Sequence, residues 1–208
     1  MQVTLIKTHF ITASDKLDDI ISKYVHGEVK GEDIIVISEK IVSIIQNRVV
    51  AKKDIKLGFW AKFLSKFAKK TPAGFSVGNP HKMQVAINLA GLPRILLASF
   101  LGGIGKLIGL PGTFYRIAGH NINRIDGFYG EAFEEYAEMG ILACEKADQV
   151  CRDLKNKFGF NFVIADVNDL GLNIIGTTYS NRKFLKEVLK SNPATQTAAQ
   201  TPIAIIHV

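Results

Sequence analysis

The chain has 208 residues, of which 47% are hydrophobic and 22% are charged, and these proportions exclude a largely disordered protein. The length allows one substantial core or at most two small ones. The net charge of +7 is concentrated, because residues 52–70 hold seven lysines and one acidic residue. This local excess excludes a nucleic-acid-binding face spread over the whole protein and indicates a single basic feature.

The two cysteines predict a reducing compartment. Cys144 and Cys151 lie seven residues apart, which is about 10 Å along a helix and too far for a disulfide. The Cys and His spacings typical of zinc sites are absent from the sequence. Residues 1–6 have the pattern of a strand and lack the basic and apolar regions of a secretory signal. We therefore expect a cytoplasmic protein.

The first quarter of the chain predicts a strand, a helix and a second strand. Residues 2–7 form the first strand, and a helix then begins at a cap on Ser14 or Asp15 and ends at Gly27. The β-branched run at 33–38 predicts a strand covered on both faces. Residues 40–45 fit either a helix or a short strand.

Two apolar segments follow. Residues 58–70 place aromatic side chains on one helical face and lysines elsewhere, which predicts a helix whose aromatic face is covered by protein or, less favoured, by a membrane surface. Residues 95–110 are apolar, but glycines and Lys106 interrupt them, so a membrane span is disfavoured. The glycines match dinucleotide and phosphate loops poorly, and tight helix packing or a turn is the favoured interpretation.

The second half continues with a strand at 114–118, a polar loop at 119–130 and an acidic segment at 131–138. A helix at 145–158, a strand at 160–165, a helix at 181–190 and a strand at 201–208 follow. This alternation predicts an α/β fold with a mixed sheet. Asp166 directly follows a buried strand, with Asp169 three residues on. Two such carboxylates suit a divalent cation, although they could equally cap the next element.

Several blocks carry a family resemblance. Residues 33–43, Asp-Ile-Ile-Val-Ile-Ser-Glu-Lys-Ile-Val-Ser, and Asn-Arg-Val-Val at 47–50 resemble the strand and turn of the coenzyme F-420 gamma-glutamyl ligases. The loop at 7–11 resembles the family's Gly-Leu-Pro-Glu-Ile loop. Ile-Ala-Gly-His-Asn at 117–121 and the segment 201–206 are similar to later blocks. The segment at about 56–111 matches poorly and has the character of an insert.

The resemblance implies a single domain over 1–208 with this insert, a mixed sheet and an intertwined homodimer. It implies a ligase in which GTP activates a carboxylate as an acyl phosphate and the amine of L-glutamate attacks it. Magnesium or manganese would bridge the phosphates, and the family pattern also allows a potassium-type site. The implied partners are a nucleotide, glutamate and a deazaflavin-type acceptor, with no nucleic acid.

Site residues follow from the same resemblance, while no catalytic residue is assigned. The implied nucleotide contacts are Thr8, His9, Phe10, Ile11, Glu39 and Arg124, and the implied metal ligands are Asp166, Asn121, Asp126 and Asp169. The family's Asp-x-x-Asn is represented by Asn121 and Arg124, and the family's lysine after Ser43 by Ile44. These departures leave two alternatives open: a catalytically altered relative that binds a nucleotide, metal or deazaflavin-like ligand, and a membrane-surface or partner-binding protein acting through residues 58–70.

Overall fold

The computed structural model describes residues 2–68, 77–129, 134–168, 171–190 and 200–208. The chain forms two compact units, unit 1 from residues 1–48 and 144–208 and unit 2 from residues 49–143. The segment expected as an insert, 56–111, lies inside unit 2. The single domain over 1–208 stays a prediction.

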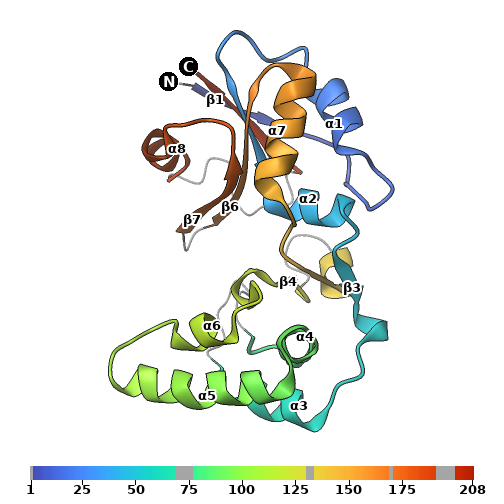
Figure 1. The fold of residues 1–208 in the computed structure, drawn as a ribbon. Coiled ribbons are helices and arrows are strands. Elements are labelled where there is room, and N and C mark those ends of the chain that lie inside the picture. The colour runs from blue at the N-terminus through green and yellow to red at the C-terminus, as the bar shows by residue number, and fades with distance from the viewer. Residues whose placement is uncertain (1, 69–76, 130–133, 169–170, 191–199) are drawn as a thin grey trace. The chain divides into compact units, whose positions relative to one another are not determined.

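Unit 1 is built on a five-stranded sheet in the order β1-β8-β2-β6-β7 (Figure 1). Its strands are β1 (Gln2–Ile6), β2 (Ile34–Ser38), β6 (Asn161–Asn168), β7 (Gly171–Thr177) and β8 (Ile203–His207). Strands β2 and β6 are parallel, whereas the other neighbours are antiparallel. The predicted mixed α/β fold is confirmed.

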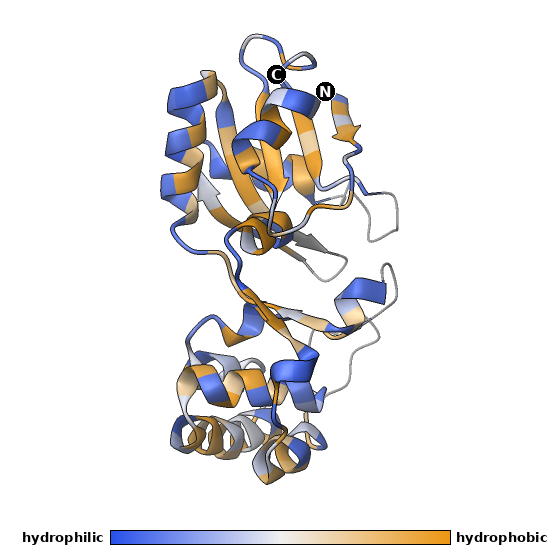
Figure 2. Cartoon of the chain, turned by 90° about the vertical axis from the view of Figure 1, so that its right-hand side faces the viewer, coloured by the Kyte–Doolittle hydropathy of each residue, from blue (hydrophilic) through white to orange (hydrophobic). Residues whose placement is uncertain are grey.

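Helices cover both faces of this sheet. Helices α1 (Leu17–Tyr24), α2 (Glu39–Ile45) and α7 (Ala147–Phe158) lie on one face, and α8 (Arg182–Leu189) lies on the other (Figure 1). Side chains alternate along β2. Ile35 and Ile37 pack in the core under α1, α2 and α7, and Ile34 and Val36 pack in the core under α8. Both faces of β2 are therefore buried, as its apolar run predicts, and the central strands are mostly orange in Figure 2.

The ends of α1 differ from the prediction. The helix begins at Leu17 with Lys16 in the capping position and no capping side chain, and it ends at Tyr24, before Gly27. Asp15 does not cap it, because both its carboxylate oxygens are engaged within the preceding loop. The undecided segment 40–45 belongs to helix α2.

The described residues of unit 2 combine four helices with a small sheet. The helices are α3 (Phe59–Ser65), α4 (Pro80–Ala90), α5 (Leu92–Leu107) and α6 (Thr113–Ala118), and the strands β3 (Val49–Ala51), β4 (Asp126–Gly127) and β5 (Met139–Ile141) pair in the order β3-β5-β4. Three short 3-10 turns, Lys52–Asp54, Ile122–Arg124 and Glu134–Ala137, connect them. Buried residues of the helices, such as Met83, Ile95 and Ala118, form a separate core.

The strand predicted at 114–118 is wrong, because these residues form helix α6. A short apolar run does not distinguish a strand from a buried helix. Here the helix is favoured because α6 packs closely on α5 over two glycines. A Cβ on Gly102 would lie 2.9 Å from the Phe114 Cβ, and one on Gly105 would lie 2.5 Å from the Thr113 Oγ1. The favoured interpretation of the glycines as helix-packing residues is confirmed.

Among the described residues, no single helix is long and apolar enough to cross a membrane. Helices α4 and α5 meet those criteria only as a pair, and they are bent by 118° relative to each other.

Candidate functional site

The register of the larger sheet brings three predicted positions to one edge. Ser38 of β2 pairs with Ala165 of the parallel strand β6. Glu39 and Asp166 are the residues that directly follow this pair. Strand β1 ends at the same edge, and the Thr8 backbone N–H donates to the Gln200 carbonyl at 2.9 Å. We call the loop 8–11, Glu39 and Asp166 the carboxyl-edge site. Adjacent strands lie about 4.8 Å apart, so Glu39 and Asp166 emerge side by side.

Strand β6 is longer than predicted. It runs to Asn168, and Asp166 lies within it, opposite Asn173 of β7. The expected strand end at 165 is therefore wrong, because pairing with β7 extends the ladder past Asp166. Asp166 does not cap a helix, since the next element in the described chain is a strand. Asp169 lies outside the described residues.

Asp166 projects from the face of β6 that carries the helices α1, α2 and α7. Phe162 and Ile164 belong to the core on that face, and Asp166 follows them at the strand period of two. Its side chain is half-buried. A carboxylate that is partly withdrawn from water favours a cationic partner.

Glu39 opens helix α2 and is only 6% exposed. Its Oε1 accepts a hydrogen bond from the Cys144 backbone N–H at 3.0 Å. Cys144 is the first residue of the segment that returns to unit 1. Glu39 therefore holds this segment against α2, and its backbone lies at the same edge of the sheet as that of Asp166.

The loop after β1 is fixed by burial and by local hydrogen bonds. Thr8 and Ile11 are each 5% exposed, and the Thr8 hydroxyl donates to the His9 carbonyl at 2.8 Å. The His9 Nε2 lies 3.0 Å from the Asp15 Oδ1. The Thr12 backbone N–H, which donates to Asp15, and then His9 lower the pKa of that carboxyl, against the opposing effect of burial.

His9 and Phe10 lie in the open part of this loop. His9 is exposed, with its Nδ1 2.9 Å from the Tyr24 hydroxyl, and Phe10 is half-buried. The loop thus has two anchored residues, Thr8 and Ile11, and two between them that can contact a ligand.

The other predicted site residues lie in unit 2. Asn121 is exposed and has a left-handed backbone with φ of 55°, and Arg124 is half-buried at the end of a 3-10 turn. Asp126 is half-buried in β4, where its Oδ2 accepts a hydrogen bond from the Tyr129 hydroxyl at 3.1 Å. These three residues share one short segment.

Sequence reasoning missed Lys82, which is only 1% exposed on helix α4. Its ammonium nitrogen lies 5.5 Å from the centroid of the Tyr129 ring, and the hydroxyl of the same tyrosine donates to Asp126. A signal was available, because Lys82 lies four residues before the buried Ala86 and therefore on the buried face of α4.

An open hollow of about 390 Å³ lies between the end of α2 and the start of α7. It is lined by Gln46, Arg48, Glu145, Lys146, Gln149, Val150 and Asp153. Arg48 forms an ion pair with Glu145 there. The hollow is at the opposite end of α2 from Glu39 and is separate from the carboxyl-edge site.

Within the described part of the chain, no three His, Cys, Asp or Glu side chains come together as a metal site. The carboxyl-edge site offers two carboxylates, Glu39 and Asp166. Magnesium commonly binds one or two protein carboxylates and takes its remaining oxygens from water and substrate phosphates. The residues therefore fit an ion shared with a phosphate ligand and do not fit an all-protein cage.

The fold and the site together define an α/β protein with acidic side chains at the carboxyl edge of its sheet, where such folds bind ligands. The family model F420-0:Gamma-glutamyl ligase matches residues 5–125, which is more than half of the chain. The protein belongs to this family, so the predicted resemblance is confirmed. The match includes the loop 8–11, Glu39 and Arg124 and ends before Asp126. No curated protein matches the chain.

Proposed function

We propose that the protein is a GTP- and divalent-metal-dependent ligase that adds L-glutamate to the carboxylate of a deazaflavin acceptor of the F420-0 type. Membership of the family supports a ligase role in coenzyme F-420 biosynthesis. The main support for a nucleotide and a metal ion is the strand register, which brings Glu39 and Asp166 to the same carboxyl edge of the sheet.

Each part of the site has a role in this proposal. The loop 8–11 contacts the nucleotide, because its buried ends, Thr8 and Ile11, hold His9 and Phe10 in place. Asp166, with Glu39 next to it, would hold magnesium or manganese. A bound ion of this kind neutralises phosphate charge and so favours attack by a carboxylate at phosphorus. Glu39 also keeps the returning segment in position through its bond to Cys144.

A second candidate is a relative that binds the nucleotide without ligating glutamate. Ile44 favours it, because this residue stands where the family pattern has a lysine and its side chain is only 5% exposed. One phosphate-binding charge is therefore missing from α2. Nucleotide binding without a glutamylated product would distinguish this candidate from the ligase.

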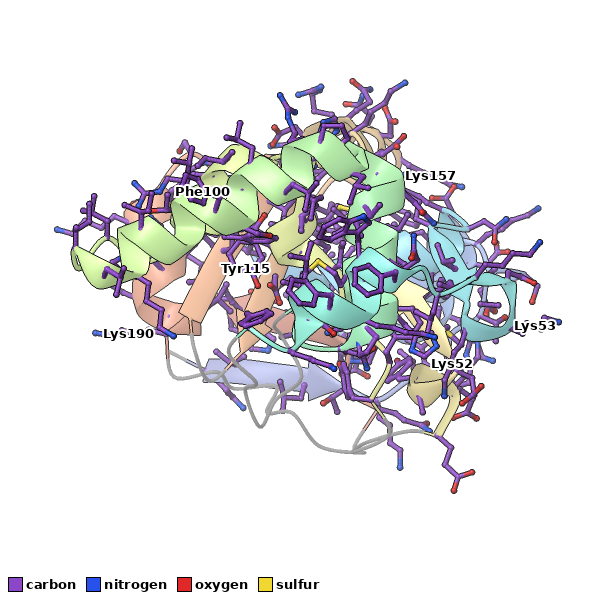
Figure 3. All side chains as sticks on the ribbon, turned by 90° about the horizontal axis from the view of Figure 1, so that it is seen from below. Lys52, Lys53, Phe100, Tyr115, Lys157 and Lys190 are labelled. Atoms are coloured by element: carbon purple, nitrogen blue, oxygen red, sulfur yellow. The ribbon has the colours of Figure 1, made fainter. Side chains whose placement is uncertain are left out.

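We also propose that the protein works in the cytoplasm as a homodimer. Cys144 and Cys151 are both buried and free, which fits a reducing compartment. Helix α5 and the turn after it expose an apolar row, Leu97, Phe100, Ile104, Leu107 and Ile108, that a second copy would cover. Phe100 lies on the outer side of α5 (Figure 3).

Thermal unfolding with GTP and manganese chloride tests the site. The wild-type protein should melt at a higher temperature when both are present, and Asp166→Asn should lose this stabilisation. Without ligands, Asp166→Asn should melt at the wild-type temperature or above it, because one carboxylate beside Glu39 has been removed.

The control is Glu187→Gln, an exposed carboxylate on α8 at the opposite face of the sheet, which should respond to GTP and manganese as the wild type does. An Asp166→Asn protein that GTP and manganese stabilise fully would refute the proposed site. The same measurement with ATP in place of GTP tests whether the site prefers guanine over adenine.

A further inference from the structure

The positive charge of the protein belongs to unit 2. Residues 49–143 hold 12 of the 26 lysines and arginines and 6 of the 19 acidic residues, so they carry six of the seven net charges. Over residues 49–128 the same 12 basic residues accompany only two acidic ones, Asp54 and Asp126. Unit 1, with the carboxyl-edge site, is nearly neutral.

Helix α3 and the turn that follows it present aromatic rings to solvent. Phe59 and Phe67 are each 71% exposed, and Trp60 and Phe63 are 40% and 41% exposed. The rings contact one another, with centroids 5.8 Å apart for Phe59 and Phe63 and 5.1 Å apart for Phe63 and Phe67. The core of unit 2 is contacted by the other side of the helix, through Ala61, Leu64 and Ser65. The sequence predicts that protein or a membrane surface covers this aromatic face, and the core of unit 2 does not cover it.

Lysines border the aromatic face. At about 100° per residue, Lys62 and Lys66 fall on the exposed arc of the helix next to Phe63, away from Leu64. Lys53 and Lys56 precede the helix and are also exposed, and Lys53 extends away from the ribbon in Figure 3. None of these four lysines forms an ion pair with a described residue.

We propose that this face, Phe59, Trp60, Phe63 and Phe67 with the neighbouring lysines, binds an anionic lipid surface. Aromatic side chains insert at the level of lipid headgroups, and lysines beside them are attracted to acidic lipids. The complementary charge favours a lipid surface over a second copy of the chain, because two copies meeting through this face would bring their lysines together. Helix α5 carries two basic residues, Arg94 and Lys106, so two copies that meet through its apolar row would bring fewer like charges together, and this row suits a second copy better. The proposal is independent of the ligase activity.

The chain contains a single tryptophan, Trp60, which reports on this face directly. Vesicles of phosphatidylcholine with 30% phosphatidylserine should shift its fluorescence to shorter wavelength and should sediment the protein at low salt. Pure phosphatidylcholine vesicles should do neither, and added salt should release the protein because charges at a surface are screened.

Two variants and a matched control make the test specific. Lys62→Gln with Lys66→Gln should weaken partitioning about 25-fold, at about fivefold per lysine. Phe59→Ser with Phe67→Ser should abolish the fluorescence shift without loss of the fold, because both rings are largely exposed. Lys183→Gln with Lys186→Gln on α8 removes the same charge from an exposed helix of unit 1 and should bind as the wild type does.

The proposal is overturned if anionic vesicles neither shift the fluorescence nor sediment the protein at low salt. It is also overturned if the lysine pairs of α3 and α8 have equal effects. A homodimer that Phe59→Ser with Phe67→Ser dissociates would show that a second copy covers the face.

Discussion

Replacing Asp33 with asparagine should weaken unit 1 in a pH-dependent way. Asp33 precedes β2, at the end of the sheet opposite the carboxyl-edge site, and is 4% exposed. Its carboxylate accepts from the backbone N–H groups of Lys30 at 3.0 Å and Val208 at 3.4 Å, and its Oδ2 lies 2.8 Å from the His207 Nδ1. The other ring nitrogen of His207 lies 2.9 Å from the Thr4 Oγ1. Asp33 thus ties three strands together.

The magnitude follows from these contacts. Burial acts most strongly and opposes ionisation, but the bonds from Lys30, His207 and Val208 and the charge of His207 together lower the pKa of Asp33 below its ordinary 3.8. A hydrogen bond to a charged group is worth about 1 kcal/mol more than a neutral one, so weakening the two short bonds costs about 2 kcal/mol. For a chain of this length that loss corresponds to a fall in Tm of about 4–8 °C.

Because the folded-state pKa of Asp33 lies below the unfolded value, its stabilisation is present in full above pH about 4 and is lost as the pH falls through the folded-state pKa. Urea unfolding followed by circular dichroism should therefore separate Asp33→Asn from the wild type at pH 7, and the difference between the two curves should shrink as the pH falls below 4. The exposed Asp19→Asn on α1 is the control. Equal stability at pH 7, or a difference that persists unchanged at pH 3, would refute the reasoning.

Three further predictions concern thiols, helix packing and assembly. Burial raises the pKa of the Cys151 thiol to about 12, so at pH 8 a thiol reagent should label Cys144 and Cys151 only after denaturant is added, and rapid native labelling of either would contradict their burial. Gly105→Ala should lower the free energy of unfolding by about 1–3 kcal/mol because its Cβ would meet α6, whereas Gly103→Ala, which faces open space, should not destabilise; equal urea midpoints would contradict this packing. Light scattering should show a dimer that Phe100→Ser converts to a monomer, and a monomeric wild type would rule out the α5 interface.

Local sequence patterns predicted the central part of the fold correctly. The run at 33–38 is apolar on both alternating faces, and only a strand covered on both sides buries it fully. The carboxyl-edge position of Glu39 and of the loop 8–11 follows from the ends of their strands. The helix at 145–158 was found because its apolar positions repeat at the helical period.

The errors arise where distant parts of the chain determine the structure. Strand β7 was not predicted, because Gly171, Asn173 and Gly176 interrupt its apolar pattern, and without β7 the end of β6 was placed too early. The segment 114–118 is helical because the glycines of α5 admit it closely. Lys82 was missed because a buried lysine is rare and its partners lie in a different segment.

The most direct test of the proposed function is product formation by the purified protein. Wild-type protein with GTP, manganese chloride, L-glutamate and F420-0 should give a product heavier by one glutamyl residue, detected by mass spectrometry, and the product should depend on GTP. Asp166→Asn should lower the rate by about 100-fold or more, as expected for loss of a metal ligand, while Glu187→Gln should keep it. Product formation by Asp166→Asn at the wild-type rate, or by the wild type without GTP, would contradict the account.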